Sequence, residues 1–403
     1  MPYDFTTLWQ RHDWDAQAVD GLGAGDGFAP DPPNPGFDII PMWVADMNFA
    51  TAPSIPSAIS KRLSHPLYGY FEIREEYYDA IIGWQSQRNG VCGLTKDAIG
   101  YENGVLGGMM SVMQALFPRG SSVLLHSPTY IGFTGSLEAA GYRIILSPLV
   151  QDEQGIWRMD LRDMEEKIRT HQIKVAVFCS PHNPSGRVWE RKELEAVMEL
   201  YEKYDLTVIS DEIWSDILLG GNCHIPIQSI SEDAKMRTVA LYAPSKTFNL
   251  AGLVGSYHII YNPALREQVR RQASICHYNN INLLSMYGLI GAYSQEGSQW
   301  LDELCQVLTQ NVDYACRYIA DHFSGVTVSR PQGTYMLFLD CTEWCRSHGM
   351  TLDQLLKAAW DVGVAVQDGR PFHGDCHIRM NLALPLSRLQ EAMKRLSTHV
   401  FSA

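Results

Sequence analysis

This sequence of 403 residues lacks the features by which membrane, secreted and nucleic-acid-binding proteins are recognised. It contains no run of about 18 apolar residues that could cross a membrane. The first residues, Met1 to Phe5, include neither the basic nor the apolar region of a secretory signal. Lysine and arginine number 32 against 45 aspartate and glutamate residues, without a basic run that would attract a nucleic acid. We therefore expect a cytoplasmic protein with no membrane or nucleic-acid partner.

Cysteine is scattered along the chain rather than clustered. The nine cysteines are an odd number without Cys-x-x-Cys spacing, which indicates reduced thiols rather than a disulfide framework. Cys341 and Cys345 are the nearest pair, and no cluster of histidine or cysteine follows them at the spacing of metal ligands. The chain also lacks a Gly-x-Ser-x-Gly elbow, a Walker phosphate loop and a His-Glu-x-x-His motif. We expect no metal, and none of these three motif-based chemistries.

What the chain does have is a regular alternation of apolar runs and amphipathic stretches. The clearest helix is predicted over residues 190–204, where apolar residues recur with helical spacing. Another helix, over residues 104–117, is predicted to begin in a glycine-rich stretch. Strands that alternate with helices indicate a doubly wound α/β sheet. The predicted buried parallel strands are Ser122–His126, Tyr142–Leu146, Lys174–Cys179, Leu206–Ser210, Thr238–Tyr242 and Ser256–Tyr261.

The chain is too long for one compact core, which predicts two domains. A long amphipathic helix over residues 300–323 is expected to link them. We predict a large domain from residues 50–290 and a smaller α/β domain from residues 1–49 and 291–403. The expected elements of the smaller domain are strands at Val326–Ser329, Tyr335–Asp340 and Ile378–Leu384 and helices near residues 352–362 and 386–399.

Four predicted strands are each followed by a residue whose side chain could bind a ligand or take part in catalysis. These side chains are, in chain order, Tyr130, Asn183, Asp211 and Lys246. Because open α/β sheets bind ligands beyond the carboxyl ends of their strands, we expect the four to converge. Each also has an ordinary alternative. Lys246 could be a solvated surface lysine, Asn183 could belong to a simple turn, and Asp211 with Glu212 could form a metal-binding or acid–base pair.

Together the four groups suit pyridoxal phosphate. A desolvated amine has a lowered pKa and can form a Schiff base with the cofactor's aldehyde, as Lys246 would. Asp211 would keep the pyridine nitrogen protonated, so that the ring can withdraw electrons. Asn183 would donate a hydrogen bond to the phenolic oxygen, and Tyr130 would stack on the ring.

Two further stretches carry candidate anion-binding groups. Backbone amides at the glycine-rich helix start, residues 104–108, form a natural phosphate site together with Ser245, and close packing of the glycines is an equal alternative. Arg379 alternates with Ile378 and Met380, so it is expected to face away from that apolar set. Its guanidinium could bind a substrate carboxylate through two hydrogen bonds, or form a surface salt bridge on an edge strand.

Six motifs follow one another through most of the chain: Pro41–Met47, Tyr68–Tyr70, Ser180–Trp189, Ser210–Ile213, Ser245–Asn249 and Arg379–Ala383. In these motifs the chain resembles the fold-type-I pyridoxal-phosphate enzymes of the aminotransferase class I/II superfamily. Within that superfamily it is most similar to the MalY/PatB-type C–S lyases (cystathionine β-lyases). The resemblance implies a large, mostly parallel sheet domain, a smaller α/β domain, pyridoxal 5′-phosphate as cofactor and a small amino acid as substrate.

The resemblance also implies a role for each matching residue. Lys246 would bind the cofactor and move the Cα proton, while Asp211 would pair with the pyridine nitrogen and Tyr130 would stack on the ring. Arg379 would bind the α-carboxylate of the substrate. Tyr70 would reach the phosphate of the neighbouring subunit, which implies a homodimer. Further implied contacts are Asn183 with the phenolic oxygen and the substrate, Val105, Leu106 and Ser245 with the phosphate, Trp214 with the cofactor, and Ala45 with the substrate.

Three features depart from the family pattern. Val254 stands eight residues after the lysine, where aminotransferases of the superfamily commonly carry arginine, and this favours the lyase branch. Trp214 replaces the usual histidine or tyrosine, and an indole donates one hydrogen bond but cannot shuttle a proton. A Gly/Pro-rich insertion at residues 21–36 lengthens the link between Trp14 and Pro41.

The implied reaction is β-elimination from L-cystathionine or related L-cysteine S-conjugates, which yields a thiol, pyruvate and ammonia. The alternative is an aminotransferase that uses the same residues on an amino acid and a 2-oxo acid. A third possibility is a regulatory or interaction protein that keeps the fold without the reaction. The complete set of site residues disfavours loss of catalysis and leaves an additional binding role open.

Overall fold

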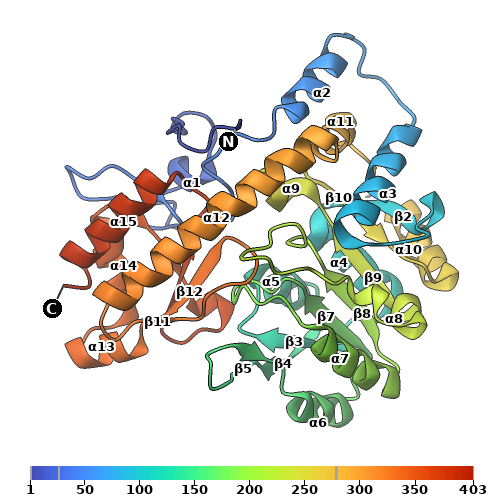
Figure 1. Cartoon of the computed structure of the whole chain (residues 1–403). Helices are drawn as coiled ribbons and strands as arrows, with labels where there is room; N and C mark the ends of the chain where they lie inside the picture. The colour runs from blue at the N-terminus through green and yellow to red at the C-terminus, as the bar shows by residue number, and fades with distance from the viewer. Residues whose placement is uncertain (1, 26–27, 277–279, 403) are drawn as a thin grey trace.

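The computed structural model describes residues 2–25, 28–276 and 280–402. Its largest sheet has seven strands (Figure 1). Every neighbouring pair in this sheet is parallel except the pairs made by the second strand, which is antiparallel to both of its neighbours. The predicted α/β class is therefore confirmed. In spatial order the strands are β2 (Ile99–Asn103), β10 (Gly255–Ile259), β9 (Thr238–Tyr242), β8 (Thr207–Asp211), β7 (Val175–Cys179), β3 (Ser122–Ser127) and β4 (Arg143–Pro148).

The central strands are apolar along their whole length because helices cover both faces of the sheet. All five residues of β7 are buried. In β3, Val123 and Leu125 pack on the face covered by α4 (Gly104–Leu116), α5 (Ile131–Ala139) and α10 (Pro263–Cys276). Leu124 packs on the opposite face, which is covered by α6 (Leu161–His171), α7 (Arg191–Lys203) and α8 (Glu232–Arg237).

Most of the predicted elements of this sheet are confirmed, with one strand in the wrong orientation and one missed. The helix predicted over residues 190–204 is α7, which begins with a capping box between Glu190 and Glu193. The strand predicted as parallel over Ser256–Tyr261 is β10, and that orientation was wrong because β10 is antiparallel to β9 and β2. β2 was not predicted, because its sequence, Ile-Gly-Tyr-Glu-Asn, is not an apolar run.

Two helices, α3 (Glu75–Asn89) and α11 (Leu283–Ala292), cover the end of the sheet formed by β2 and β10. α2 (Ser54–Leu63) packs on α11, and the chain between α2 and α3 includes the Tyr68–Tyr70 motif. Tyr77 and Ile81 of α3 pack with Ile99, Tyr257 and Met286 in one apolar cluster. This packing fixes β2, and thereby the start of α4, which follows β2 without a break.

The smaller sheet is antiparallel and is built from the C-terminal part of the chain. Its strands are, in spatial order, β11 (Thr327–Val328), β12 (Met336–Asp340), β15 (His377–Asn381) and β14 (Gln367–Asp368). The helices around it are α12 (Gln295–His322), α13 (Thr342–His348), α14 (Leu352–Asp361) and α15 (Leu386–His399). Helices α12, α14 and α15 confirm the predicted ones, whereas α13 was not predicted. Figure 1 shows the long α12 running from α11 towards this sheet. The predicted domain boundaries at residues 50 and 290 stay a prediction.

The N-terminal segment packs against the C-terminal part of the chain that builds the smaller sheet. Its strand β1 (Ile40–Pro41) pairs in parallel with β13 (Val364–Ala365), and Figure 1 shows both chain ends on this side of the molecule. Asp26 and Gly27 of the Gly/Pro-rich insertion lie outside the described residues. Across the residues that are described, no helix has both the length and the apolar character needed to span a bilayer. Other short elements include α1 (Gln17–Asp20) and the hairpin of β5 (Val150–Gln151) and β6 (Trp157–Arg158).

Candidate active site

A cavity of about 210 Å³ opens at the carboxyl ends of β7, β8 and β9. These strands and β3 are neighbours that run in the same direction, so the residues that follow them meet at one edge of the sheet. Arg379 approaches from the smaller sheet, whereas Tyr70 is fully exposed and does not line the cavity. Nine of the eleven residues predicted for the site line it: Ala45, Val105, Leu106, Tyr130, Asn183, Asp211, Trp214, Ser245 and Lys246.

Lys246 lies in α9 (Pro244–Thr247), a single helical turn that begins just after β9. Its Nζ donates a hydrogen bond to the carbonyl oxygen of Ala45 at 2.9 Å. Burial, reinforced by the positive charge of Arg379, lowers the pKa of this amine to about 8. Near neutral pH more of this amine is therefore uncharged and nucleophilic than in the solvated surface lysine of the alternative interpretation.

The backbone around Lys246 is fixed from two sides. Behind the turn, Thr247 Oγ1 donates to the buried carboxylate of Asp216 at 2.9 Å, and Trp84 Nε1 donates to the same carboxylate at 3.0 Å. Asn249 has a left-handed φ of 58° and makes two hydrogen bonds of 3.0 Å with the backbone of Met47, one through each atom of its amide. Sequence reasoning missed Asp216, whose link to Lys246 depends on tertiary packing.

Asp211 ends β8 and is 5% exposed. Its Oδ1 accepts a hydrogen bond of 3.0 Å from the backbone N–H of Ile213. Burial raises the pKa of this carboxyl to about 7, although the nearby Lys246 acts in the opposite direction. A cation that enters the cavity beside Asp211 would therefore be attracted strongly, because the buried carboxylate lacks the solvent that would otherwise stabilise its charge.

Arg379 is buried on β15, an inner strand between β12 and β14, so the alternative of a surface salt bridge on an edge strand is wrong. Nη2 donates to the carbonyl oxygen of Trp43 at 3.0 Å, and Nη1 donates to Oδ1 of Asn183 at 3.4 Å. The guanidinium also lies 4.2 Å from the ring centre of Phe372. Burial lowers its pKa to about 10. Among the described residues it has no carboxylate partner within ion-pair distance, which leaves it suited to an anionic ligand.

The junction between β2 and α4 provides a second anion-binding element. Gly104, at the first position of α4, has a φ of 76°, a conformation that favours glycine. First-turn amides have no acceptor within their own helix, so they can donate to a phosphate. Gly107 lines the cavity, which supports the phosphate interpretation. Gly108 instead packs against the sheet, since a Cβ there would lie 2.8 Å from Leu241 Cδ2.

Two aromatic side chains bound the cavity. Tyr130 caps the start of α5 and packs edge to face on Phe133, with ring centres 5.4 Å apart. Burial raises the pKa of its hydroxyl, so Tyr130 stays neutral. Trp214 is buried and packs edge to face on Tyr335, with ring centres 4.7 Å apart. The Tyr335 hydroxyl donates to the carbonyl oxygen of Ala45 at 3.1 Å, a contact that sequence reasoning did not assign.

Residues 43–48, here named the floor segment, connect the two sheets at this cavity, which Ala45 lines. Arg379 donates to the carbonyl of Trp43, while Lys246 and Tyr335 both donate to the carbonyl of Ala45. The side-chain amide of Asn381 donates to the carbonyls of Val44 and Asp46, at 2.7 and 2.5 Å. Asn381 belongs to the motif Arg379–Ala383 that the sequence analysis singled out, but no role was predicted for it.

The residues around the cavity fit pyridoxal phosphate on physical grounds. Lys246 offers an amine with a lowered pKa, Asp211 a buried carboxylate that would stabilise a ring cation, and Arg379 a buried guanidinium for a substrate carboxylate. The start of α4 offers amides for the phosphate. On a mostly parallel sheet with helices on both faces, this site defines the fold-type-I class of pyridoxal-phosphate-dependent enzymes. The chain belongs to the aminotransferase class I and II family, whose model matches residues 44–396.

Individual relatives point to one branch of this family. The cystathionine beta-lyase PatB of Bacillus subtilis (strain 168) is 32% identical over 361 residues, covering 89% of this chain and 92% of PatB. Protein MalY of Escherichia coli (strain K12) is 28% identical over 404 residues, 98% of each chain. The crystal structure of the PLP-bound C-S lyase from Staphylococcus hominis has a TM-score of 0.89 at 26% identity, over 100% of this chain and 99% of that chain. These similarities confirm the predicted superfamily and branch.

Proposed function

We propose that this chain is a pyridoxal-phosphate-dependent C–S β-lyase that acts on L-cystathionine or related L-cysteine S-conjugates and yields a thiol, pyruvate and ammonia. The observation that carries the proposal is the buried amine of Lys246, whose pKa is lowered to about 8 and whose charged neighbours include Asp211 and Arg379. The 32% identity to a cystathionine beta-lyase supports the same reaction.

The proposed cofactor would supply an electron sink that stabilises negative charge at the Cα of the substrate. Lys246 would hold it covalently, and Asp211 would keep its ring nitrogen charged. That ring cation would in turn lower the raised pKa of Asp211, because an opposite charge favours the ionised carboxylate. The other contacts proposed for it are Asn183 with the phenolic oxygen, Tyr130 with the ring face, Trp214 with its edge, and Val105, Leu106 and Ser245 with the phosphate.

The protein's own groups would orient the substrate and move its proton. Arg379 would bind the α-carboxylate, with Asn183 and the floor segment beside it, and so fix which bonds at Cα face the amine. Lys246 Nζ, when uncharged, would accept the Cα proton. A pKa of about 8 places this base close to physiological pH, where general-base catalysis is efficient.

Transamination is the competing function, since the family model describes aminotransferases. Val254, which lines the cavity where aminotransferases commonly carry arginine, supports elimination. Incubation of the pure protein with L-cystathionine and no 2-oxo acid should release pyruvate and a thiol. A reaction that strictly requires an added 2-oxo acid such as 2-oxoglutarate would instead assign the chain to transamination.

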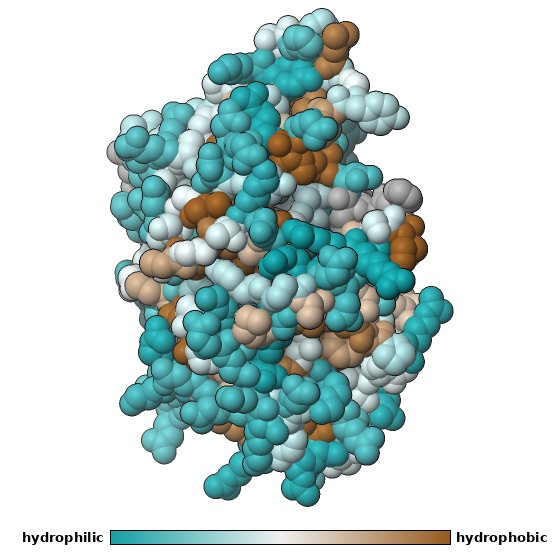
Figure 2. Space-filling model, turned by 90° about the vertical axis from the view of Figure 1, so that its right-hand side faces the viewer, coloured by the Kyte–Doolittle hydropathy of each residue, from teal (hydrophilic) through white to brown (hydrophobic). Residues whose placement is uncertain are grey.

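We also propose a homodimer in which Tyr70 completes the neighbouring site. Leu67, Tyr68 and Tyr70 are exposed between α2 and α3, and Figure 2, which views the molecule from the right-hand side of Figure 1, shows apolar side chains exposed among polar ones. Mixing Lys246→Ala and Tyr70→Ala chains tests this arrangement. Each hybrid dimer would contain one intact site, so random mixing should restore about a quarter of the wild-type activity. No recovery on mixing two inactive variants would contradict a shared site.

A cytoplasmic location is also part of the proposal. All nine cysteines are free thiols, and Cys179, Cys341 and Cys345 are buried, which suits a reducing compartment. Cell fractionation with an antibody against the native protein would test it, and recovery in a secreted fraction would contradict it.

A further inference from the structure

Arg11 is the outer end of a chain of contacts that reaches Lys246. Its Nη2 donates to Oδ2 of Asp46 at 2.5 Å, and its Nη1 donates to Oδ1 of Asn48 at 2.9 Å. Asp46 follows Ala45, whose carbonyl oxygen accepts the hydrogen bond from Lys246. The side chains of Arg11 and Asp46 are only 17% and 20% exposed, so this ion pair is screened less by salt than a pair on the open surface.

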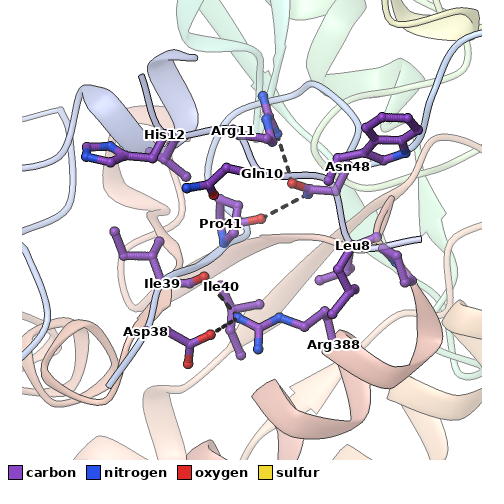
Figure 3. Close-up of a pocket in the computed structure, with 14 residues that line it drawn as sticks. Leu8, Gln10, Arg11, His12, Asp38, Ile39, Ile40, Pro41, Asn48 and Arg388 are labelled. Carbon is purple, nitrogen blue, oxygen red and sulfur yellow. Dashed lines mark hydrogen bonds and ion pairs between the residues drawn. The ribbon is translucent and has the colours of Figure 1, made fainter. Parts of the chain in front are cut away.

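The same arginine lines a cavity of about 360 Å³ between the N-terminal segment and the start of α15. Figure 3 shows Arg11 beside Asn48 at one end of this cavity and Arg388 with Asp38 at the other. Arg388 donates to Oδ2 of Asp38 at 2.7 Å and to the carbonyl oxygen of Ile39 at 3.0 Å. It is therefore a matched control: a second ion-paired arginine of this cavity whose hydrogen bonds lie outside the floor segment.

We propose that Arg11 is a positioning residue for the reaction. By pairing with Asp46 it fixes the floor segment at the Ala45 carbonyl and neutralises a carboxylate that acts on Lys246, which keeps the amine available in its uncharged form. This inference rests on the proposed function in one respect, namely that Lys246 is the reactive amine.

The charges that act on Lys246 come from three directions and oppose one another. Burial and the guanidinium of Arg379, on β15, lower the pKa of the amine. Asp46 of the floor segment and Asp211 at the end of β8 raise it. The balance therefore depends on how far Asp46 is compensated by a partner of its own, and Arg11 is that partner.

Three aromatic residues described near the amine, Tyr335, Tyr130 and Trp214, carry no charge that could replace Arg11 as the partner of Asp46. The Tyr335 hydroxyl shares the Ala45 carbonyl with Lys246, and burial raises its pKa well above the ordinary value. Tyr130, on the other side of the cavity, is also neutral because burial raises its pKa. The indole of Trp214 lies 5.8 Å from Nζ and does not titrate. Removal of Arg11 would therefore expose Lys246 to an uncompensated negative charge.

The test is a pH titration of the visible absorption of the bound cofactor in the holoenzyme, which reports protonation at Lys246. Arg11→Gln should raise the titration midpoint by about 0.5 to 1 pH unit, since an unpaired carboxylate favours the protonated form. The acidic limb of the kcat/KM profile should move in the same direction. Asp46→Asn should lower the midpoint, and Arg388→Gln should leave both the midpoint and the activity unchanged.

An unshifted midpoint in Arg11→Gln, or equal shifts in Arg11→Gln and Arg388→Gln, would overturn the inference. If Arg11→Gln does not fold, Asp46→Asn decides: a lowered midpoint supports the coupling, and an unchanged midpoint overturns it. A wild-type protein that gives no cofactor band would overturn the proposed function as well. A normal wild-type band with no shift in the variants overturns the role of Arg11 alone.

Discussion

Lys246 and Ala45, 201 positions apart in the chain, are joined by a hydrogen bond of 2.9 Å from the amine to the carbonyl oxygen. The hydroxyl of Tyr335, which precedes β12 of the smaller sheet, donates to the same oxygen at 3.1 Å. One peptide carbonyl thus connects the candidate reactive amine of the large sheet with the smaller sheet. The direction in which this amine points therefore depends on the packing of both sheets.

Replacing Lys246 removes the proposed reactive amine. Lys246→Ala should abolish pyruvate release and the visible absorption band of the bound cofactor, because no other described lysine lines the cavity. Absorption spectroscopy and a pyruvate assay on the purified variant measure both effects. Lys203→Ala is the control, since Lys203 is exposed and pairs with Glu165 at 2.6 Å. Full turnover in Lys246→Ala would exclude Lys246 from the mechanism.

Replacing Arg379 should weaken substrate binding more than it slows turnover. Arg379→Lys keeps the charge but loses the planar pair of donors, and the loss of a charged hydrogen bond predicts a rise in KM of about 10- to 100-fold. Steady-state kinetics with L-cystathionine measure this change. An analogue that lacks the α-carboxylate should react equally poorly with both enzymes. If the wild type and the variant prefer L-cystathionine over that analogue by the same factor, Arg379 does not bind the α-carboxylate.

Asp211 should give the cofactor-free protein a distinct pH dependence. Its pKa is about 7 in the folded chain and about 3.8 in the unfolded chain. The native state therefore binds the proton more tightly, so the stabilisation is complete below pH 4 and is lost as the pH rises to 7. The loss is roughly 4 kcal/mol, from about three pKa units at 1.36 kcal/mol each.

Denaturant unfolding of the wild type and of Asp211→Asn between pH 4 and pH 8 measures the pH-dependent contribution of Asp211 to the free energy of unfolding. The difference in free energy of unfolding between the two should fall as the pH rises, because asparagine does not titrate. Asp31→Asn, at an exposed position, is the control for the same exchange outside the cavity. A pH-independent difference for Asp211→Asn would mean that the carboxylate is already ionised in the cofactor-free chain.

Val254 carries backbone strain at the edge of the cavity. Its φ of 53° lies in the left-handed region, which a β-branched residue rarely adopts. Val254→Asn should raise the free energy of unfolding by about 1 kcal/mol, because asparagine tolerates this conformation. Thermal denaturation measures the gain. The same exchange at Val150, exposed in β5 and outside the left-handed region, should not stabilise the chain, and a matching gain there would argue against relief of strain.

The sequence located most strands of the large sheet because helices on both faces make them continuously apolar. It did not reveal β2, and the structure gives the physical reason. Glu102 of β2 is fully buried and bonds His258 of β10 at 2.7 Å, while a Cβ at Gly100 would lie 2.3 Å from the same histidine ring. The polar and small residues of β2 thus serve a partner 156 positions away, which no local pattern encodes.

The orientation of β10 was missed for a related reason. Parallel neighbours require a crossover that returns the chain to the opposite end of the strands, usually through a full helix. The chain between β9 and β10 contains only the single turn α9 and a short turn at residues 251–253, so β10 starts at the end where β9 stops. A buried parallel strand and a buried antiparallel strand can both be apolar runs, so the sequence of the strand alone does not reveal its orientation. The strand-end residues Tyr130, Asn183, Asp211 and Lys246 could be placed because sheet topology gathers them, but the contact of Arg11 with Asp46 depends on tertiary packing.

The floor segment also sets the order in which the protein can become functional during synthesis. It is bonded by Lys246 from the middle of the chain and by Asn381 and Arg379, which lie more than 330 positions after it and close to the C-terminus. Because domains form as the chain leaves the ribosome, the large sheet can fold well before these last contacts are available. The nascent protein therefore carries its lysine on a folded sheet in an unfinished pocket, and truncation before β15 should leave it without catalytic function.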